Sequence, residues 1–157
     1  MLESQPPPLP RFPRDARIAN VVSDRMRKIR STDTKPEMRV RRLLHRMGFR
    51  FRLHRCDLPG KPDVVLPRYR LAILVHGCFW HQHPGCRHAR LPRTRQNYWL
   101  PKLARTQERD LRNVVELNRL GWRTLTIWEC SVDKLDKLEA ILRRVTAAPQ
   151  AASAEVI

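Results

Sequence analysis

The sequence predicts one α/β domain with three layers, in which a mixed sheet lies between helices. Two runs, residues 71–75 and 122–128, are rich in the apolar and β-branched residues typical of buried strands. Segments with a helical spacing of apolar residues precede, separate and follow these strands. With 157 residues, the chain has the length of one domain that can bury a substantial core.

The N-terminal part predicts an arm followed by helices. Residues 1–15 contain five prolines within their first thirteen positions and no hydrophobic period, which predicts a disordered, Pro-rich basic arm. Residues 17–30 are basic and carry apolar side chains at near-helical spacing. Thr34 and Glu37 have the spacing of a capping box, so a second helix is expected to begin there and to end at Gly48.

The remaining elements follow from turn signals and periodicity. We expect strands at 49–53 and 63–66, a helix at about 98–120 and a last helix at about 134–145. The apolar face of the 98–120 helix is assigned to six residues: Leu103, Leu111, Val114, Val115, Leu117 and Leu120. The folded domain is expected to span residues 16–146, and residues 147–157 are expected to form a frayed tail.

The charge of the chain indicates a polyanionic partner. Lys and Arg total 32 against 15 Asp and Glu, a net charge of +17. Such an excess of positive charge opposes compaction unless a partner such as nucleic acid neutralises it. No apolar run has the length of a membrane-spanning helix, and no signal peptide is recognisable, so we expect no membrane contact and a cytoplasmic location.

Cysteines and histidines gather directly after the 71–75 strand. Cys78, His83 and Cys86 lie within nine residues, and Cys130 follows the 122–128 strand. Pairing of these two strands would bring the four side chains to one edge of the sheet. Thiolates with an imidazole are the usual ligands of structural zinc, which the clustering favours over free thiols and surface histidines. Cys56 has no comparable neighbour.

Asp63 opens an apolar strand after a Pro-Gly-Lys-Pro turn. A buried aspartate needs a cation or hydrogen bonds, and Mg²⁺ is one candidate. A carboxylate that caps the turn is the commoner use of aspartate at such a position. The residue considered alone therefore leaves both interpretations open.

Several motifs in order resemble one family. Asp63 followed by a second short strand resembles the framework of restriction-endonuclease-like nucleases, although Val75-His76-Gly77 replaces their usual Glu-x-Lys. More specifically, residues 23–132 resemble the very-short-patch mismatch repair (Vsr-type) endonucleases. The motifs that carry this resemblance are Leu-Pro-Gly-Lys-Pro-Asp at 58–63, His-Gly-Cys-Phe-Trp-His at 76–81, Glu-Arg-Asp at 108–110, Gly-Trp-Arg at 121–123 and Trp-Glu-Cys at 128–130.

The resemblance implies a restriction-endonuclease-like fold and Mg²⁺-dependent nicking of one DNA strand, 5′ to the thymine of a T:G mismatch. It implies that Asp63 and the Val75 carbonyl bind Mg²⁺, and that His81 is the general base. Asp110 would orient His81, with His76 and Glu37 as further catalytic partners. Cys78, His83, Cys86 and Cys130 match the family's structural zinc ligands. His81 is an alternative zinc ligand, but the compact spacing of His83 and Cys86 favours His83.

The resemblance also implies a DNA-binding set. Phe79, Trp80 and Trp99 correspond to an aromatic wedge that inserts beside the mismatch, where unstacking costs least. Met26 corresponds to a residue that enters from the opposite groove, and Lys102 is a candidate base or phosphate contact. Core positions are the alternative for Trp80, Trp99 and Met26.

The expected partner is double-stranded DNA with a T:G mismatch, and mismatch-repair proteins are candidate partners. Nicking of a single strand is compatible with a monomer. Gly85 is an insertion relative to the family pattern, and residues 1–15 lie outside the resemblance. Two other functions fit fewer observations: a nuclease of the same fold without mismatch preference, and a catalytically silent, zinc-stabilised DNA-binding protein.

Overall fold

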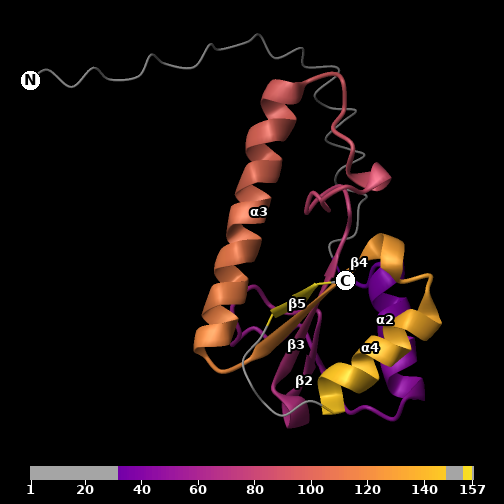
Figure 1. Cartoon of the computed structure of the whole chain (residues 1–157). Coiled ribbons are helices and arrows are strands. Elements are labelled where there is room, and N and C mark those ends of the chain that lie inside the picture. Colours follow the sequence, from indigo (N-terminus) through magenta and orange to yellow (C-terminus); the bar gives the residue numbers. More distant parts are fainter. Residues whose placement is uncertain (1–31, 148–153, 157) are drawn as a thin grey trace, which may run out of the picture. The chain divides into compact units, whose positions relative to one another are not determined.

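A mixed sheet of five strands organises the part of the chain that the computed structural model describes, residues 32–147 and 154–156 (Figure 1). The strand order is β1-β2-β3-β4-β5. β1, β2 and β3 pair antiparallel, whereas β3, β4 and β5 pair parallel. The strands are β1 (Arg52–Leu53), β2 (Val64–Leu66), β3 (Leu71–His76), β4 (Arg123–Trp128) and β5 (Ala154–Val156).

Helices cover both faces of this sheet, which confirms the mixed α/β prediction. α2 (Lys35–Arg46) and α4 (Leu135–Ala147) pack on one face, and α3 (Gln96–Arg119) lies on the other (Figure 1). The alternation of strand side chains explains this arrangement. Val64, Leu71 and Ile73 join the cluster with the α2 and α4 side chains. Val65 and Ala72 join Leu117 of α3 in a second cluster.

The capping box predicted for α2 is present. The Thr34 backbone N–H reaches Glu37 Oε1 at 3.4 Å, and the Thr34 hydroxyl lies 2.7 Å from the same oxygen. Beyond the C-cap Met47, Gly48 adopts a left-handed φ of +79°, the conformation that glycine tolerates best and that ends a helix. The cap fixes the first turn of α2, and with it the position of Glu37.

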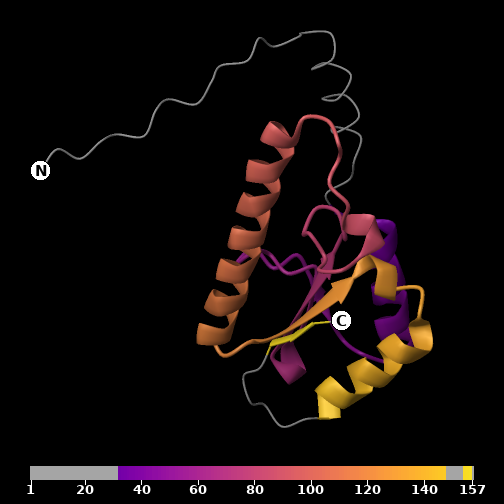
Figure 2. The same ribbon diagram turned by 45° about the horizontal axis from the view of Figure 1, so that its top comes forward.

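The apolar face assigned to the long helix is wrong in part. Leu103 and Leu117 are buried, but Leu111, Val115 and Leu120 are 67%, 40% and 51% exposed. α3 extends well past the sheet in both ribbon views (Figures 1 and 2). Its C-terminal part meets the sheet through Leu117, so the apolar residues of its middle turns have no layer to pack against.

Two further expectations differ from the structure. The strand expected at 49–53 is reduced to Arg52–Leu53, because Phe49 and Phe51 instead pack against the main core cluster. Within the expected frayed tail, residues 154–156 form β5 and extend the sheet in parallel with β4. This pairing satisfies backbone groups that β4 would otherwise leave at an open edge. The expected N-terminal arm and the basic segment 17–30 lie outside the described residues.

Candidate active site

The parallel pairing of β3 and β4 brings the Cys/His segment and Cys130 to one edge of the sheet. His76 is opposite Trp128 in the register, so both strands end at the same level. Residues 77–86 leave the end of β3, and the short 3₁₀ helix Glu129–Ser131 leaves the end of β4. Figure 2 shows the chain continuing from this edge to the N-terminal end of α3. One end of the sheet therefore carries most of the candidate site.

The four predicted zinc ligands form one cluster. One ligand atom from each of Cys78, His83, Cys86 and Cys130 lies within 4.8 Å of all the others. His83 Nδ1 is 3.6 Å from Cys78 Sγ and 3.4 Å from Cys130 Sγ. Tetrahedral zinc with ordinary Zn–S and Zn–N bonds separates sulfur from nitrogen by about 3.6 Å. The donor set and its spacing therefore fit zinc.

The surroundings of these ligands also suit a cation. Cys78 has no exposed surface, and burial raises the pKa of its thiol to about 12. A thiolate at that position needs a positive charge beside it. A backbone N–H of His88 lowers the pKa of Cys86, and burial lowers the pKa of His83, which favours the neutral imidazole that binds metals. The His83 ring stacks on Trp128 at 4.2 Å, which fixes its orientation.

His81 is not part of this cluster. Its Nδ1 lies 2.5 Å from Oδ2 of Asp110 on α3, and both side chains are largely buried. The ring of His76 stacks on the ring of His81, with centroids 3.9 Å apart and planes 8° apart. Burial lowers the pKa of His76 to about 4, so His76 is neutral near pH 7. The pair with Asp110 leaves Nε2 of His81 as the ring nitrogen that can exchange a proton.

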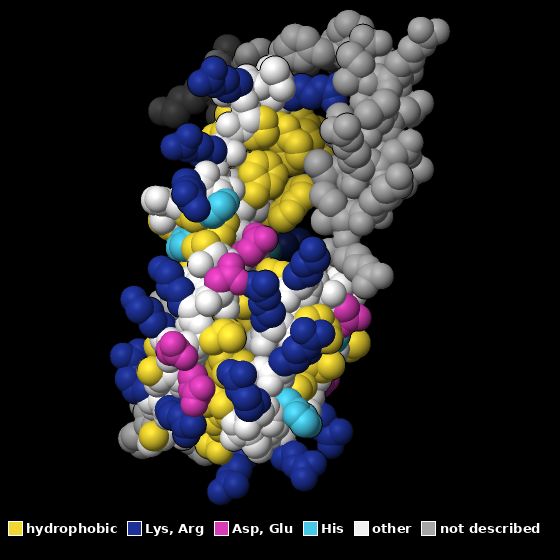
Figure 3. All heavy atoms as spheres, turned by 90° about the vertical axis from the view of Figure 1, so that its right-hand side faces the viewer, with side chains coloured by type: hydrophobic (Ala, Val, Ile, Leu, Met, Phe, Trp, Pro, Cys, Tyr) yellow, Lys and Arg dark blue, Asp and Glu magenta, His cyan; other side chains and the backbone are white. Residues whose placement is uncertain are grey.

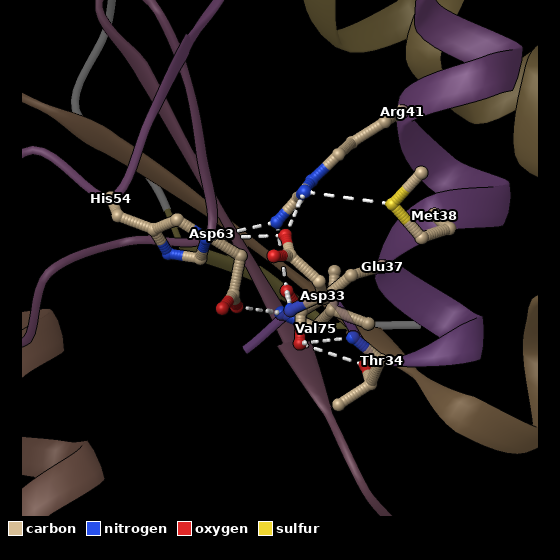
Figure 4. A network of polar contacts seen from close by, with 8 residues as sticks. All are labelled: Asp33, Thr34, Glu37, Met38, Arg41, His54, Asp63 and Val75. Carbon is tan, nitrogen blue, oxygen red and sulfur yellow. Dashed lines mark hydrogen bonds and ion pairs between the residues drawn. The ribbon is translucent and has the colours of Figure 1, made fainter. Parts of the chain in front are cut away.

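Asp63 and Val75 meet at the other side of β3. The backbone N–H of Val75 donates to Asp63 Oδ2 at 2.7 Å (Figure 4). The turn before Asp63 is fixed by Gly60, which has a φ of +70° and packs against Asn113 of α3. A Cβ atom at Gly60 would lie 2.5 Å from the Asn113 amide nitrogen, so no other residue fits there without displacement.

One buried carboxylate, Glu37, and two basic side chains, Arg41 and His54, lie around Asp63. Burial raises the pKa of Asp63 to about 6, and the charge of Glu37 adds to this effect. Arg41 and His54 act in the opposite direction. Glu37, Arg41, His54 and Asp63 point toward one another between α2 and the sheet in Figure 4. A half-buried acidic group with this pKa is the kind of site that a divalent cation would stabilise.

The aromatic residues form a fourth group. Phe79 lies 5.1 Å from Trp80 and 5.3 Å from Trp99, measured between ring centroids. Lys102 Nζ is within 5.7 Å of the ring centroids of Trp80, Tyr98 and Trp99. Phe79 and Trp80 are half-buried. Trp99 is only 9% exposed and packs against the other rings of this group. In the space-filling view, hydrophobic side chains gather near the upper end, and Lys and Arg are spread over the face (Figure 3).

The structure thus brings the predicted site residues into four neighbouring groups, except Met26, which lies outside the described residues. Four residues near these groups were not predicted: Arg41, His54, Tyr98 and Trp128. In the sequence, Trp128 looks like an ordinary residue of a buried strand, and Tyr98 like an ordinary residue of a helix. Arg41 and His54 gave no signal, because each lies among other basic residues in the sequence.

Comparison with known proteins agrees with this geometry. The family model of the DNA mismatch endonuclease Vsr matches residues 17–87. The chain is 51% identical over 120 residues to the type II nicking enzyme V.XorIIP of Xanthomonas oryzae, covering 76% of this chain and 88% of that protein. It is 43% identical over 125 residues to the DNA mismatch endonuclease Vsr of Escherichia coli, covering 78% of this chain and 80% of that protein.

A solved structure shares the fold. The catalytic domain of the homing endonuclease I-Bth0305I superposes with a TM-score of 0.50, at 23% identity, over 74% of this chain and 100% of that domain. The fold, the ordered motifs and the two similar sequences lead to the same assignment. The chain belongs to the Vsr family of DNA mismatch endonucleases.

Proposed function

We propose that this DNA endonuclease nicks one strand of duplex DNA at a T:G mismatch, on the 5′ side of the mismatched thymine, and requires Mg²⁺. The names of two similar proteins, a DNA mismatch endonuclease and a nicking enzyme, support mismatch recognition and single-strand cleavage. The observation that carries the proposal is the placement of a histidine–aspartate pair and a half-buried aspartate at the end of the same strand, β3.

Asp63 and the Val75 carbonyl are the proposed Mg²⁺ ligands. Oδ2 of Asp63 accepts the Val75 N–H, and its other oxygen has no hydrogen-bond partner among the described residues. Mg²⁺ usually takes one or two carboxylates and keeps several waters, so this donor set fits it. Bound there, Mg²⁺ would neutralise the charge that develops on the phosphoryl oxygens. Glu37 lies near this carboxylate and contributes negative charge.

His81 is the proposed general base. Asp110 holds Nδ1 at 2.5 Å, which directs Nε2 toward the attacking water and stabilises the imidazolium that forms on proton transfer. His76 is neutral and stacks on His81, so it restricts the orientation of the ring without adding a competing charge. Both groups that position His81 come from elements outside the loop, β3 and α3.

The Cys78, His83, Cys86 and Cys130 cluster is the proposed structural zinc site. Two of its ligands enclose functional residues in the sequence. Phe79, Trp80 and His81 lie between Cys78 and His83. A metal that fixes these two ligands also fixes the residues between them. Zinc in this proposal therefore positions the general base and two aromatic rings, and takes no part in the hydrolysis.

Mismatch recognition is assigned to the aromatic group. Phe79 and Trp80 are half-exposed beside Lys102, and their rings offer surfaces on which unstacked bases can stack. Inserting side chains between base steps costs a few kcal/mol, and a mismatched step costs least. This difference would favour T:G over paired DNA. The net charge of +17 supplies phosphate contacts that depend on salt but not on sequence.

The test is a strand-specific nicking assay on duplexes with one T:G mismatch, with each strand labelled separately and matched T:A duplexes beside them. Asp63→Asn removes the proposed metal carboxylate while keeping the size of the side chain. We expect a Mg²⁺-dependent nick 5′ to the mismatched thymine, reduced by about 10³-fold or more in Asp63→Asn, because several kcal/mol of metal stabilisation are lost.

Each other outcome excludes one part of the proposal. Equal cleavage of T:A duplex would remove the mismatch preference and leave a nuclease of the same fold. Full activity in EDTA would remove the Mg²⁺ requirement. Unchanged activity of Asp63→Asn would remove Asp63 from the site. No cleavage of any duplex that the protein binds would favour a DNA-binding protein without catalysis.

A further inference from the structure

Trp128 is a buried residue to which the proposed reaction has given no role so far. It is the last residue of β4, is 6% exposed, and is the partner of His76 in the parallel register of β3 and β4. Its indole Nε1 is buried and has no hydrogen-bond partner among the described residues. Such an unpaired N–H costs free energy that leucine or phenylalanine would not cost at this position. The ring contacts of Trp128 supply a reason for tryptophan here.

These contacts join two parts of the candidate site. The indole stacks on the His83 ring, with centroids 4.2 Å apart and planes 6° apart. The His76 ring meets the indole in a T-shaped arrangement, with centroids 5.4 Å apart and planes 73° apart. His76 in turn stacks on His81 at 3.9 Å. The four rings therefore form one continuous row, from a proposed zinc ligand to the proposed general base.

The parallel sheet and the loop after β3 create this row. Side chains of partner residues in a parallel pair leave the sheet on the same face, so His76 and Trp128 lie beside each other. The loop turns back through a hydrogen bond from the His83 N–H to the Cys78 carbonyl, at 3.0 Å. The indole contacts both histidines at this point. A single six-membered ring offers less surface for two partners, which favours tryptophan over phenylalanine.

Zinc binding would strengthen the contact between His83 and the indole. Nδ1 of His83 lies 3.6 Å from Cys78 Sγ and 3.4 Å from Cys130 Sγ, so it is the ring nitrogen on the side of the thiols. A bond from this nitrogen to zinc would fix the plane of the ring, and with it the surface against which the indole packs. A fixed His83 would then hold Trp128, and Trp128 would hold His76 against His81.

We propose that Trp128 is a positioning residue that couples the zinc site to the catalytic histidines, by packing against His83 and His76 at once. The coupling is reciprocal: zinc orders the row of rings, and the row strengthens zinc binding. Trp128 acts only through these two histidines. The inference rests on the proposed function, because it concerns the proposed zinc site and the proposed general base, His81.

The first experiment measures Zn²⁺ affinity without DNA. Dissociation constants are determined by competition with a chromophoric chelator for four full-length proteins: wild type, His76→Ala, Trp128→Leu and the double variant. Leucine keeps an apolar side chain and removes the ring. We expect His76→Ala to weaken zinc binding by about 2- to 10-fold in the wild-type background, the range that one aromatic pair contributes. In the Trp128→Leu background, His76→Ala should have no further effect.

Equal effects of His76→Ala in both backgrounds would overturn the coupling and leave the zinc site intact. A wild-type protein that binds no zinc would overturn the proposed zinc site and this inference together. Circular dichroism checks that each variant is folded. If Trp128→Leu does not fold, Trp128→Met takes its place in the cycle, and equal effects there have the same meaning. Because no cleavage is measured, the result does not depend on T:G nicking.

The second readout separates positioning from general stability. At saturating zinc, Trp128→Leu should lower kcat for nicking by about 10-fold, the lower end of the effect of losing a group that orients a metal ligand. KM for the duplex should change less than about twofold, because Trp128 is buried. Trp128→Phe keeps a ring and should recover a large part of kcat.

Trp122→Leu is the matched control. Trp122 is 7% exposed and packs in the second core cluster, away from the row of rings. Its replacement should lower the melting temperature and leave kcat and zinc affinity nearly unchanged. Equal losses of kcat in Trp122→Leu and Trp128→Leu, or no recovery in Trp128→Phe at equal melting temperature, would overturn the proposal and leave Trp128 a purely structural role.

Discussion

The two halves of the candidate site are built in different ways. The half that faces α3 is compact in sequence: His76, Cys78, His81, His83 and Cys86 lie within eleven positions. The half that faces α2 combines Asp33, Glu37, Arg41, His54 and Asp63, which come from three separate segments of the chain, residues 33–41, 54 and 63. Strand β3 contributes to both halves, to one through the His76 side chain and to the other through the Val75 backbone N–H.

This difference determines what holds each half. The α3-facing half is a loop, and under the zinc proposal its order would depend on the Cys/His cluster. The α2-facing half rests on a capped helix that packs on the sheet through Val40, Leu43 and Leu44. Loss of a metal should therefore disorder the first half and leave the second intact.

The largest effect is expected from Cys130→Ser, which removes one proposed zinc ligand. Structural zinc in small modules contributes about 10–16 kcal/mol of binding free energy, and most of it should be lost from the loop. Zinc content and nicking activity should both fall, and hydrogen exchange should rise in residues 77–86 but not in α2. Cys56→Ser is the matched control, since Cys56 is exposed and outside the cluster. Equal exchange in both halves would contradict the comparison.

The next effect is expected from His81→Gln, which tests the catalytic part of the same half. Loss of a general base lowers kcat by about 10²- to 10⁴-fold. Zinc content and affinity for the duplex should stay the same, because His81 contacts Asp110 and His76 and is not in the zinc cluster. His88→Gln is the control, since His88 is exposed. A loss of zinc in His81→Gln would show that His81 is a ligand.

A smaller effect is expected from Trp80→Ala, which removes one stacking surface. The affinity for a T:G duplex should weaken by about 1–3 kcal/mol, the usual value for stacking of one base. Binding of the zinc-loaded protein is measured by fluorescence anisotropy without added Mg²⁺, at fixed salt. The affinity for matched T:A duplex should fall less, because insertion there is rarer. An equal loss on both duplexes would place Trp80 in general DNA binding.

The smallest effect is expected from Leu111→Ser, which tests the exposed middle of α3. Leu111 is 67% exposed, so the free energy of unfolding should change by less than about 0.5 kcal/mol. Leu117→Ala on the same helix is the contrast, because Leu117 is fully buried and its loss should cost about 2–5 kcal/mol. Urea unfolding measures both. A large effect of Leu111→Ser would show that this face is covered in solution.

The two halves of the site also differ in how well their residues could be predicted from the sequence. The Cys/His segment was recognisable because its residue types are rare and adjacent, and Cys130 joined it once two strands were assumed to pair. Asp63 alone was ambiguous, and its role came from a resemblance. Arg41 could not be found, because one arginine among many on a basic helix gives no sign that it is buried. The apolar spacing in α3 gave a wrong prediction of burial. Leu111 and Val115 fit the apolar face of a helix, but no layer of the described residues covers that face.

The position of Cys130 has a consequence for the order of assembly. Three of the four proposed zinc ligands lie within nine residues of chain, so even an unfolded chain could bring them to one zinc ion. Cys130 follows Cys78 by 52 positions, and all of α3 lies between them. Its bond to zinc would close that loop, and closing a loop of this length by a cross-link removes about 4 kcal/mol of chain entropy from the unfolded state. Under the zinc proposal, Cys130 would thus form a reversible cross-link, which requires that β4 has first paired with β3.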